Sequence, residues 1–249
     1  MKGVQGTNTT GGNIVSFNFP AACSFGKTQG ANAQIGEEAA FKYATALNSL
    51  LAKESRQKIQ VGDATVVFWS EQNSVLEDEF LDLFGEPAKD NPDKGVNAVE
   101  RLFSSVKTGA FSHEDDGTRF YVLGLAPNSA RISVRFWHVG TVIEMEKRFA
   151  DWFEDLRIAH GVKDKEHLSL WRLLISTATQ GKTENINPNL SGSVMRSILS
   201  GSPLPDTLLN AVLVRMKAND DKWNDLLYPR IKLLKAYLNR KSKERKYKI

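Results

Sequence analysis

The sequence predicts an α+β fold: a small mixed or antiparallel sheet with helices, followed by a helical C-terminal part. Apolar residues alternate or run together at 58–69, 119–125 and 131–139, which predicts strands. From about residue 141 to the end, apolar residues recur at helical spacing. We therefore expect a mixed α+β domain over residues 1–145 and a helical domain over 146–249, with the two able to share one core.

The N-terminal 36 residues are predicted to be irregular, because seven glycines alternate with Thr, Asn and Gln. One short strand is expected at 13–19, where four apolar side chains are available to pack. A helix is expected from residue 36 to about 53, with acidic residues in its first turn. Its predicted apolar stripe consists of Ala40, Phe41, Ala44, Leu47, Leu50 and Leu51.

Two helices are expected in the acidic segment, near 75–84 and 95–107, separated by Pro87 and Pro92. The strands 119–125 and 131–139 follow, joined by a tight turn at 126–129. Alternation along the second strand places Arg131, Ser133, Arg135 and Trp137 on one face, opposite Ile132, Val134, Phe136 and His138.

Five helices are expected in the C-terminal part, at about 142–160, 166–179, 190–200, 206–218 and 222–241. Pro203, Pro205 and Asp206 mark the beginning of the fourth. We expect the large aromatic side chains of this part to pack between helices: Trp152, Phe153, Trp171 and Trp223.

The composition is that of an ordinary globular protein, with 41% hydrophobic and 25% charged residues in 249. No apolar run approaches the roughly 20 residues that span a bilayer, and the polar N-terminus does not resemble a signal peptide. The single cysteine, Cys23, cannot form an internal disulfide. We expect a cytoplasmic protein without a membrane partner.

The net charge of +4 is distributed unevenly along the chain. Residues 71–116 carry twelve acidic and four basic side chains, whereas the chain from 117 onward carries 23 basic and 13 acidic ones. Such asymmetry suits a polyanion or an acidic protein surface as partner. A solvated helix with a basic tail is the alternative interpretation.

Catalytic motifs are not found. Two Gly-Lys-Thr triplets lack the glycine of a phosphate-binding loop, because Ala21 and Ser176 occupy its position. The run His113-Glu114-Asp115-Asp116 gathers possible metal ligands, but consecutive loop residues do not converge without partners elsewhere. We therefore expect no enzymatic activity, no cofactor and no metal; a hydrolase using residues 113–116 is a weaker alternative.

Six segments resemble one known family. They read GVQGTNTTGGNIVSFNFP from residue 3, SFGKTQGANAQIGEEAAFKYATALNSLL from 24, VGDATVVFWSE from 61, LGLAPNSARISVRFW from 123, NLSGSVMRSILSGSPLPDTLLNAVLVRMKAND from 189 and IKLLKAYLNRK from 231. In order and content they resemble the large subunit of the type I-C CRISPR surveillance complex, Cascade (the Csd-one family). The resemblance covers most of the chain. Compared with the family, a long N-terminal region and a C-terminal helical segment are expected to be absent.

The resemblance implies a non-catalytic subunit of an RNA-guided antiviral complex. Such a subunit helps to bind target double-stranded DNA near the protospacer-adjacent motif, stabilises the opened duplex (the R-loop) and recruits a helicase-nuclease. The implied partners are Cascade subunits that hold the CRISPR RNA: backbone, handle-binding and small subunits. The alternative function is a protein–protein scaffold within the complex that has little direct contact with DNA.

Nucleic-acid contacts are predicted at two N-terminal loops, one strand and the last helix. Glycines allow close approach of the loop backbones, amide side chains can bond base edges, and Lys and Arg can hold phosphates. Ordinary turns that bond their own backbone are the alternative. Trp137 is available for stacking beside the strand arginines. The candidate residues are Lys2, Gln5, Asn8, Lys27, Gln29, Asn32, Arg131, Arg135, Arg230, Lys235, Arg240 and Lys241.

Overall fold

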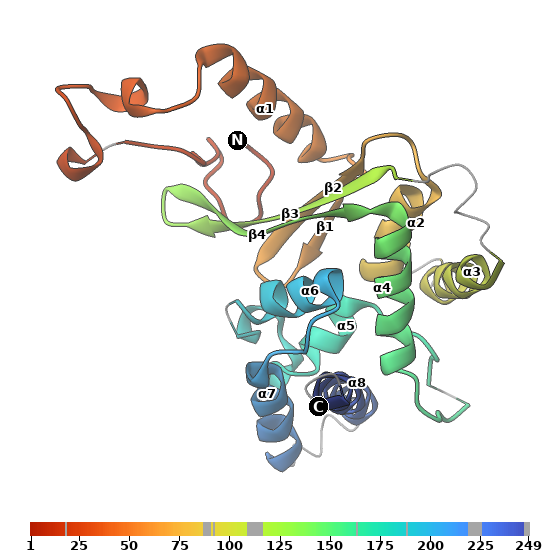
Figure 1. Ribbon diagram of the computed structural model, residues 1–249. Helices are drawn as coiled ribbons and strands as arrows, with labels where there is room; N and C mark the ends of the chain where they lie inside the picture. Colours follow the sequence, from red (N-terminus) through yellow and green to blue (C-terminus); the bar gives the residue numbers. More distant parts are fainter. Residues whose placement is uncertain are drawn as a thin grey trace.

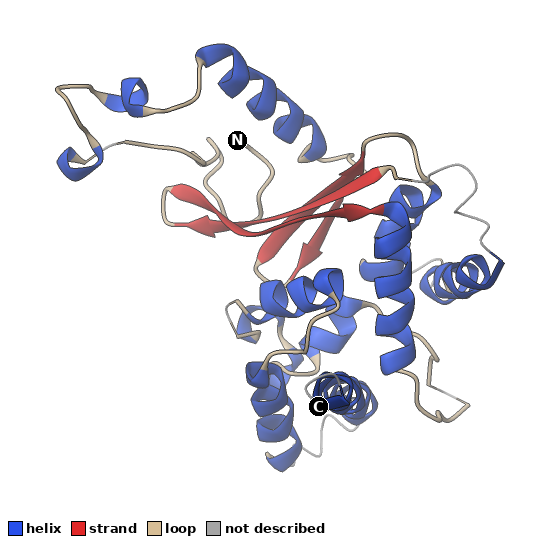
Figure 2. Cartoon of the chain, in the orientation of Figure 1, coloured by secondary structure: helices blue, strands red, loops and turns tan. Residues whose placement is uncertain are grey.

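The centre of the molecule is a four-stranded antiparallel sheet with strand order β1-β2-β3-β4, shown in red in Figure 2. In this computed structural model the described residues are 1–17, 19–86, 91, 93–108, 117–162, 164–187, 189–218 and 226–246, the last three by their backbone alone. The strands are β1 (Lys58–Val61), β2 (Ala64–Ser70), β3 (Arg119–Asn128) and β4 (Arg131–Thr141). The predicted α+β class, with a helical C-terminal part, is confirmed.

The strand predicted at 58–69 is a hairpin of two strands. Val61 pairs with Ala64, so that only Gly62 and Asp63 form the turn. Gly62 has φ of 60°, the left-handed conformation that short hairpin turns require. The turn predicted at 126–129 is also displaced: β3 continues to Asn128, and the chain reverses at Ser129 and Ala130.

A bulge in β4 reverses the predicted alternation of its side chains. Leu125 pairs with Val134 and Gly124 with Phe136, which leaves Arg135 without an opposite residue. One extra residue moves the side chains that follow it to the other face. Ile132 and Phe136, which we expected on one face, therefore belong to two different hydrophobic clusters.

The large core lies between one face of the sheet and most of the helices (Figure 1). Side chains of the strands, such as Val66, Phe68 and Phe120, pack there against Phe80, Phe149 and other helix residues. The helices concerned are α2 (Val75–Phe84), α3 (Lys94–Thr108), α4 (Val142–Asp155), α5 (Leu170–Ile175), α6 (Leu190–Ser200), α7 (Asp206–Lys217) and α8 (Leu227–Lys246).

Most predicted helices are found, with ends set by local capping. Helix α4 begins at a capping box in which Thr141 and Glu144 exchange hydrogen bonds, and α2 begins after Ser74, whose hydroxyl accepts from Glu77 N. The helix predicted at 166–179 is shorter: it begins after Ser169, which caps its first turn, and it ends at Ile175. Short 3₁₀ turns lie at Pro20–Ala22, Gln29–Asn32, Thr179–Gly181 and Thr183–Asn185.

The opposite face of the sheet is covered in part by helix α1 (Glu37–Leu50) and by the N-terminal segment (Figure 1). Val4, Leu47 and Leu51 pack there on Val67 and Leu123. Two predictions are wrong in this layer. The strand expected at 13–19 is reduced to one bridge between Asn13 and Arg131, with Asn18 outside the described residues. Phe41 is 72% exposed and not part of the buried stripe.

Helices long and apolar enough to cross a membrane are not found in the described part of the chain.

Candidate nucleic-acid interface

The first N-terminal loop has a fixed backbone and free side chains. The amino group of Met1 donates to Gly12 O, and Gly12 N donates back to Met1 O, both at 2.9 Å. Gln5 N donates to Thr65 Oγ1 of β2 at 3.0 Å, and the side chain of Val4 is buried in the cluster on this face of the sheet. The loop is thus held to the sheet, while the side chains of Lys2, Gln5 and Asn8 are exposed.

The second loop, residues 24–32, is closed by one of the predicted site residues. The Asn32 side chain accepts from Ser24 N at 3.0 Å and donates to Gln29 O at 3.1 Å. Its amide therefore serves the turn, as in the alternative interpretation of these loops. Lys27 and Gln29 are exposed, and Gln29 has φ of 44°, which is uncommon for a residue with a side chain.

Five of the six loop candidates share one property. Their side chains make no hydrogen bond or ion pair with any described residue: Lys2, Gln5, Asn8, Lys27 and Gln29. A fixed backbone that presents unpaired amides and ammonium groups is suited to bonding base edges and phosphates.

The two arginines of β4 do not form a groove with Trp137. The Arg131 guanidinium lies over the Phe19 ring, 5.5 Å from its centre, near the tip of the β3–β4 hairpin. Arg135 forms an ion pair with Asp63 at 3.2 Å, and its Cβ lies near Gly192 of α6. Because Arg135 is the bulge residue, it and Trp137 are on opposite faces of the sheet, and the predicted common face is wrong.

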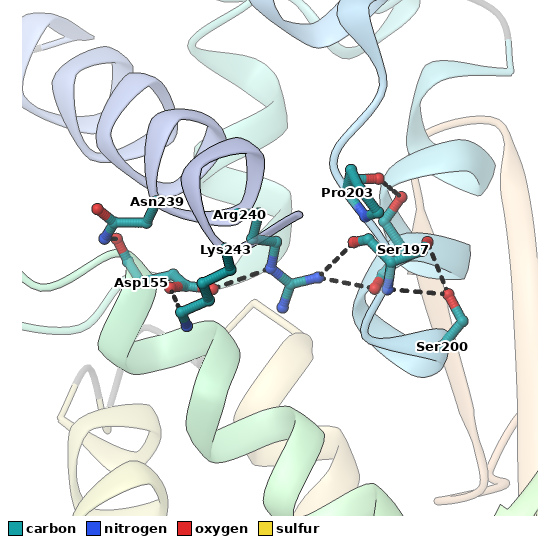
Figure 3. A network of polar contacts seen from close by, with 8 residues as sticks. Asp155, Ser197, Ser200, Pro203, Asn239, Arg240 and Lys243 are labelled. Atoms are coloured by element: carbon teal, nitrogen blue, oxygen red, sulfur yellow. Dashed lines mark hydrogen bonds and ion pairs between the residues drawn. The ribbon is translucent and has the colours of Figure 1, made fainter. Parts of the chain in front are cut away.

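Helix α8 uses its basic residues inside the protein. Arg240 is 5% exposed; its Nε pairs with Asp155 at 2.9 Å, and its Nη1 donates to Ser197 O at 2.7 Å (Figure 3). Arg230 is 7% exposed and donates to Ser176 O at 2.8 Å. The prediction that these two arginines hold phosphates is therefore wrong, because their guanidinium groups are buried on internal acceptors.

Three further basic side chains of α8 also bond to acceptors within the protein. Lys235 donates to Arg157 O, and Lys241 pairs with Asp206 at 3.1 Å. Lys232, which is 1% exposed, donates to Leu156 O and Glu166 O. Burial lowers the pKa of Lys232 to about 8.

The carbonyl groups that accept from α8 lie at the C-terminal ends of other helices. Ser176, Leu156 and Arg157 follow the last residues of α5 and α4, and Ser197 lies in the last turn of α6. The last carbonyls of a helix have no partner within the helix and carry partial negative charge. Basic side chains of α8 therefore satisfy the C-terminal ends of several helices at once.

An aromatic cluster that was not predicted from the sequence lies on the sheet face that bears α1. Trp69, Tyr121 and Trp137 come from three adjacent strands, with ring centres 5.2 to 5.9 Å apart. Trp69 and Tyr121 are stacked, and Trp137 is 51% exposed. Their alternating positions indicated strands, but only the register of β2, β3 and β4 brings the rings together.

A metal site is not visible in the described residues, since no three His, Cys, Asp or Glu side chains there are placed to hold an ion. His113, Glu114, Asp115 and Asp116 lie outside the described residues. The absence of catalysis therefore stays a prediction.

A family model described as CRISPR-associated protein (Cas_Csd1) matches residues 1–249, the whole of the chain. No curated protein matches the chain.

Proposed function

Since the chain belongs to the Cas_Csd1 family of CRISPR-associated proteins, which are components of Cascade, we propose that it is a non-catalytic subunit that contacts target DNA. In this proposal it binds the duplex near the protospacer-adjacent motif and stabilises the opened strands. Its outer surface contacts the neighbouring subunits and the recruited helicase-nuclease. The protein reads a short duplex feature, and base pairing with the guide reads the remaining sequence.

The observation that carries the proposal is the pair of N-terminal loops. Their backbones are fixed by hydrogen bonds to the sheet and within the loops, while the side chains of Gln5, Asn8, Lys27 and Gln29 are exposed and have no partner among the described residues. Amide groups can donate to and accept from base edges, and the ammonium group of Lys27 can bind a phosphate. A fixed loop also loses little conformational entropy on binding.

One observation favours the alternative function, a protein–protein scaffold with little contact to DNA. Some of the basic residues that made the C-terminal part look suited to a polyanion bond to acceptors inside the protein. These residues are Arg230, Lys232 and Arg240. The C-terminal helical part therefore offers less basic surface than its sequence suggests.

The test is target binding by reconstituted complexes that carry single variants in the second loop. Lys27→Ala should weaken binding to all sequences alike and make the dependence on salt less steep by about one counterion. Gln29→Ala should weaken binding to a duplex with the correct motif more than binding to a duplex without it. Both proteins should assemble and melt as the unmodified protein does.

Asn32→Ala is the matched control, since its amide closes the loop. This variant should disorder the loop. Binding should then weaken, and the loop should be cleaved more readily by a protease. If Lys27→Ala and Gln29→Ala bind with unchanged affinity and salt dependence, the loops are structural turns and the scaffold function is favoured.

A further inference from the structure

We infer that the aromatic cluster, with the cleft beside it, is a binding site for an unpaired base of single-stranded nucleic acid. The inference rests on the proposed function, because opening a duplex produces unpaired strands. We name the site the aromatic cleft and define it by the rings Trp69, Tyr121 and Trp137 and by the α1 residues Tyr43 and Leu50 that face them.

The cleft has the size and lining of a site for a flat apolar group. Its volume is about 610 Å³, within the ordinary range of small-ligand sites. Trp69, Trp137 and Leu123 of the sheet form one side, and Tyr43, Leu47 and Leu50 of α1 form the other. Trp137 offers half of its surface to solvent, and the neighbouring Val139 is 40% exposed.

The wall formed by α1 is held in place by hydrogen bonds from β1 and by packing on the sheet. Lys58 of β1 donates through Nζ to Leu51 O at 3.0 Å and to Ala52 O at 2.7 Å, at the C-terminal end of α1. Leu47 and Leu51 are buried against the sheet. The cleft is therefore formed before a ligand arrives, which favours stacking of an inserted ring.

Two unpaired arginines flank the rings. Arg119 is two residues before Tyr121 on β3, so both side chains leave the same face of the strand. Lys58 pairs with Val67, and Phe68 N donates to Gln57 O; this register places Arg56 beside Trp69 at the start of β1. Both arginines are exposed, and neither forms an ion pair with a described residue.

The charge around the rings favours a polyanion over an apolar protein segment. One acidic residue, Glu71, lies beside Arg119: its backbone N donates to Arg119 O, and its side chain forms no ion pair with a described residue. Cations on both sides of stacked aromatic rings are the arrangement by which single strands are bound without sequence preference. Bases within a duplex are stacked on each other, so that only an unpaired base can place its face on Trp137.

The experiment follows tryptophan fluorescence of the full 249-residue chain during titration with a 12-nucleotide oligothymidine. Stacking on Trp137 should quench the emission. An oligonucleotide of the same length with abasic sites keeps the phosphates and lacks the bases, so it should bind more weakly and quench little. Oligouridine in a parallel titration shows whether the site distinguishes RNA from DNA.

Three variants sharpen the test. Trp137→Ala should weaken binding of oligothymidine on the order of 5- to 100-fold, whereas Trp137→Phe keeps a ring and should retain most of the affinity. Arg119→Ala should make the salt dependence less steep. Phe41→Ala is the matched control, because Phe41 is an exposed aromatic residue of α1 outside the cleft lining; it should leave binding unchanged.

The outcomes separate this inference from the proposed function. Equal quenching by the abasic strand, or unchanged affinity of Trp137→Ala, would overturn stacking in the cleft while leaving the loop contacts untouched. Loss of complex assembly in Trp137→Ala, with oligonucleotide binding unchanged, would also overturn it and assign the face to a protein neighbour. If quenching depends on Trp137 while Lys27→Ala leaves duplex binding unchanged, the result supports base stacking in the aromatic cleft. The same result contradicts only the proposed contacts of the N-terminal loops.

Discussion

At the scale of single residues, the ion pair of Arg240 and Asp155 is the clearest case of a basic residue with a structural role. Both side chains are nearly fully buried, with 4% and 3% of their surface exposed. Arg240 also donates to Ser197 O and Ser202 O, and Lys243 pairs with the second oxygen of Asp155 (Figure 3). The pair is satisfied on both sides, which a buried charge requires.

Arg240→Ala should lower the free energy of unfolding by about 3–5 kcal/mol, because it leaves Asp155 Oδ2 and two carbonyls buried without their donor, while Lys243 stays paired with Asp155 Oδ1. Urea unfolding measures the loss. The neighbouring Lys241→Ala is the matched control: Lys241 pairs with Asp206 at the surface, where solvent screens the charges, and its loss should be much smaller. Equal losses would mean that the buried pair contributes no more than a surface one.

His167 should make stability depend on pH. Burial lowers the pKa of His167 from 6.5 to about 4, and its ring lies between those of Phe103 and Phe153. In the unfolded chain the imidazole binds a proton at higher pH than in the folded protein. The free energy of unfolding should therefore fall as pH decreases from about 6.5 to about 4, by on the order of 3 kcal/mol from this group.

The measurement compares unfolding of the unmodified protein with His167→Asn at pH 7 and pH 4.5. The difference in the free energy of unfolding between the two proteins should change from pH 7 to pH 4.5, because the variant has no group to titrate at that position. His160→Asn, at an exposed histidine, is the control for the replacement of a histidine by asparagine. A pH-independent difference for His167→Asn would contradict the prediction.

At the scale of elements, the bulge in β4 decides which side chains enter which core. It sends Phe136 into the large core and leaves Trp137 on the opposite face, beside Trp69 and Tyr121. Gly124 of β3 makes room for this arrangement. A Cβ at Gly124 would lie 2.3 Å from the Phe136 ring.

Gly124→Ala should therefore destabilise the protein by about 1–3 kcal/mol, since the ring or the strand must shift. Gly30→Ala is the control, because a Cβ there meets nothing within 4 Å, and it should leave stability nearly unchanged. Thermal unfolding of both variants gives the comparison. If Gly124→Ala melts at the temperature of the unmodified protein, the close packing at the bulge is not required.

At the scale of the whole molecule, one hydrophobic cluster extends across the predicted domain boundary at 145/146. It contains Ile59 of β1, Phe80 of α2, Phe149 of α4, Val194 of α6 and Tyr237 of α8. The sheet and the C-terminal helices thus bury their apolar surfaces against each other. We expect the two predicted domains to unfold as one unit.

The prediction is a single transition in urea, with far-ultraviolet circular dichroism and tryptophan fluorescence changing together. Trp152, fully buried in the shared cluster, contributes to the fluorescence signal. Two separated transitions, or a fluorescence change that precedes the loss of helix, would show that residues 1–145 and 146–249 form independent domains.

Local sequence patterns determined the class of fold and most elements. Helices such as α2, α6 and α7 were predicted within a residue or two, because capping residues and apolar periodicity are local properties. The polar loops before α1 were also recognised from composition, and five of their six candidate side chains are available for contacts. The family was apparent from the sequence as well.

Tertiary structure alone decided which charged and aromatic residues are buried and which are exposed. The basic residues of α8 have the same composition whether they face solvent or the ends of other helices, and only packing shows that Arg230 and Arg240 are buried. Likewise, the grouping of Trp69, Tyr121 and Trp137 depends on strand register and on one bulge residue, Arg135. Register and helix packing are long-range properties, and for that reason composition and periodicity did not contain them.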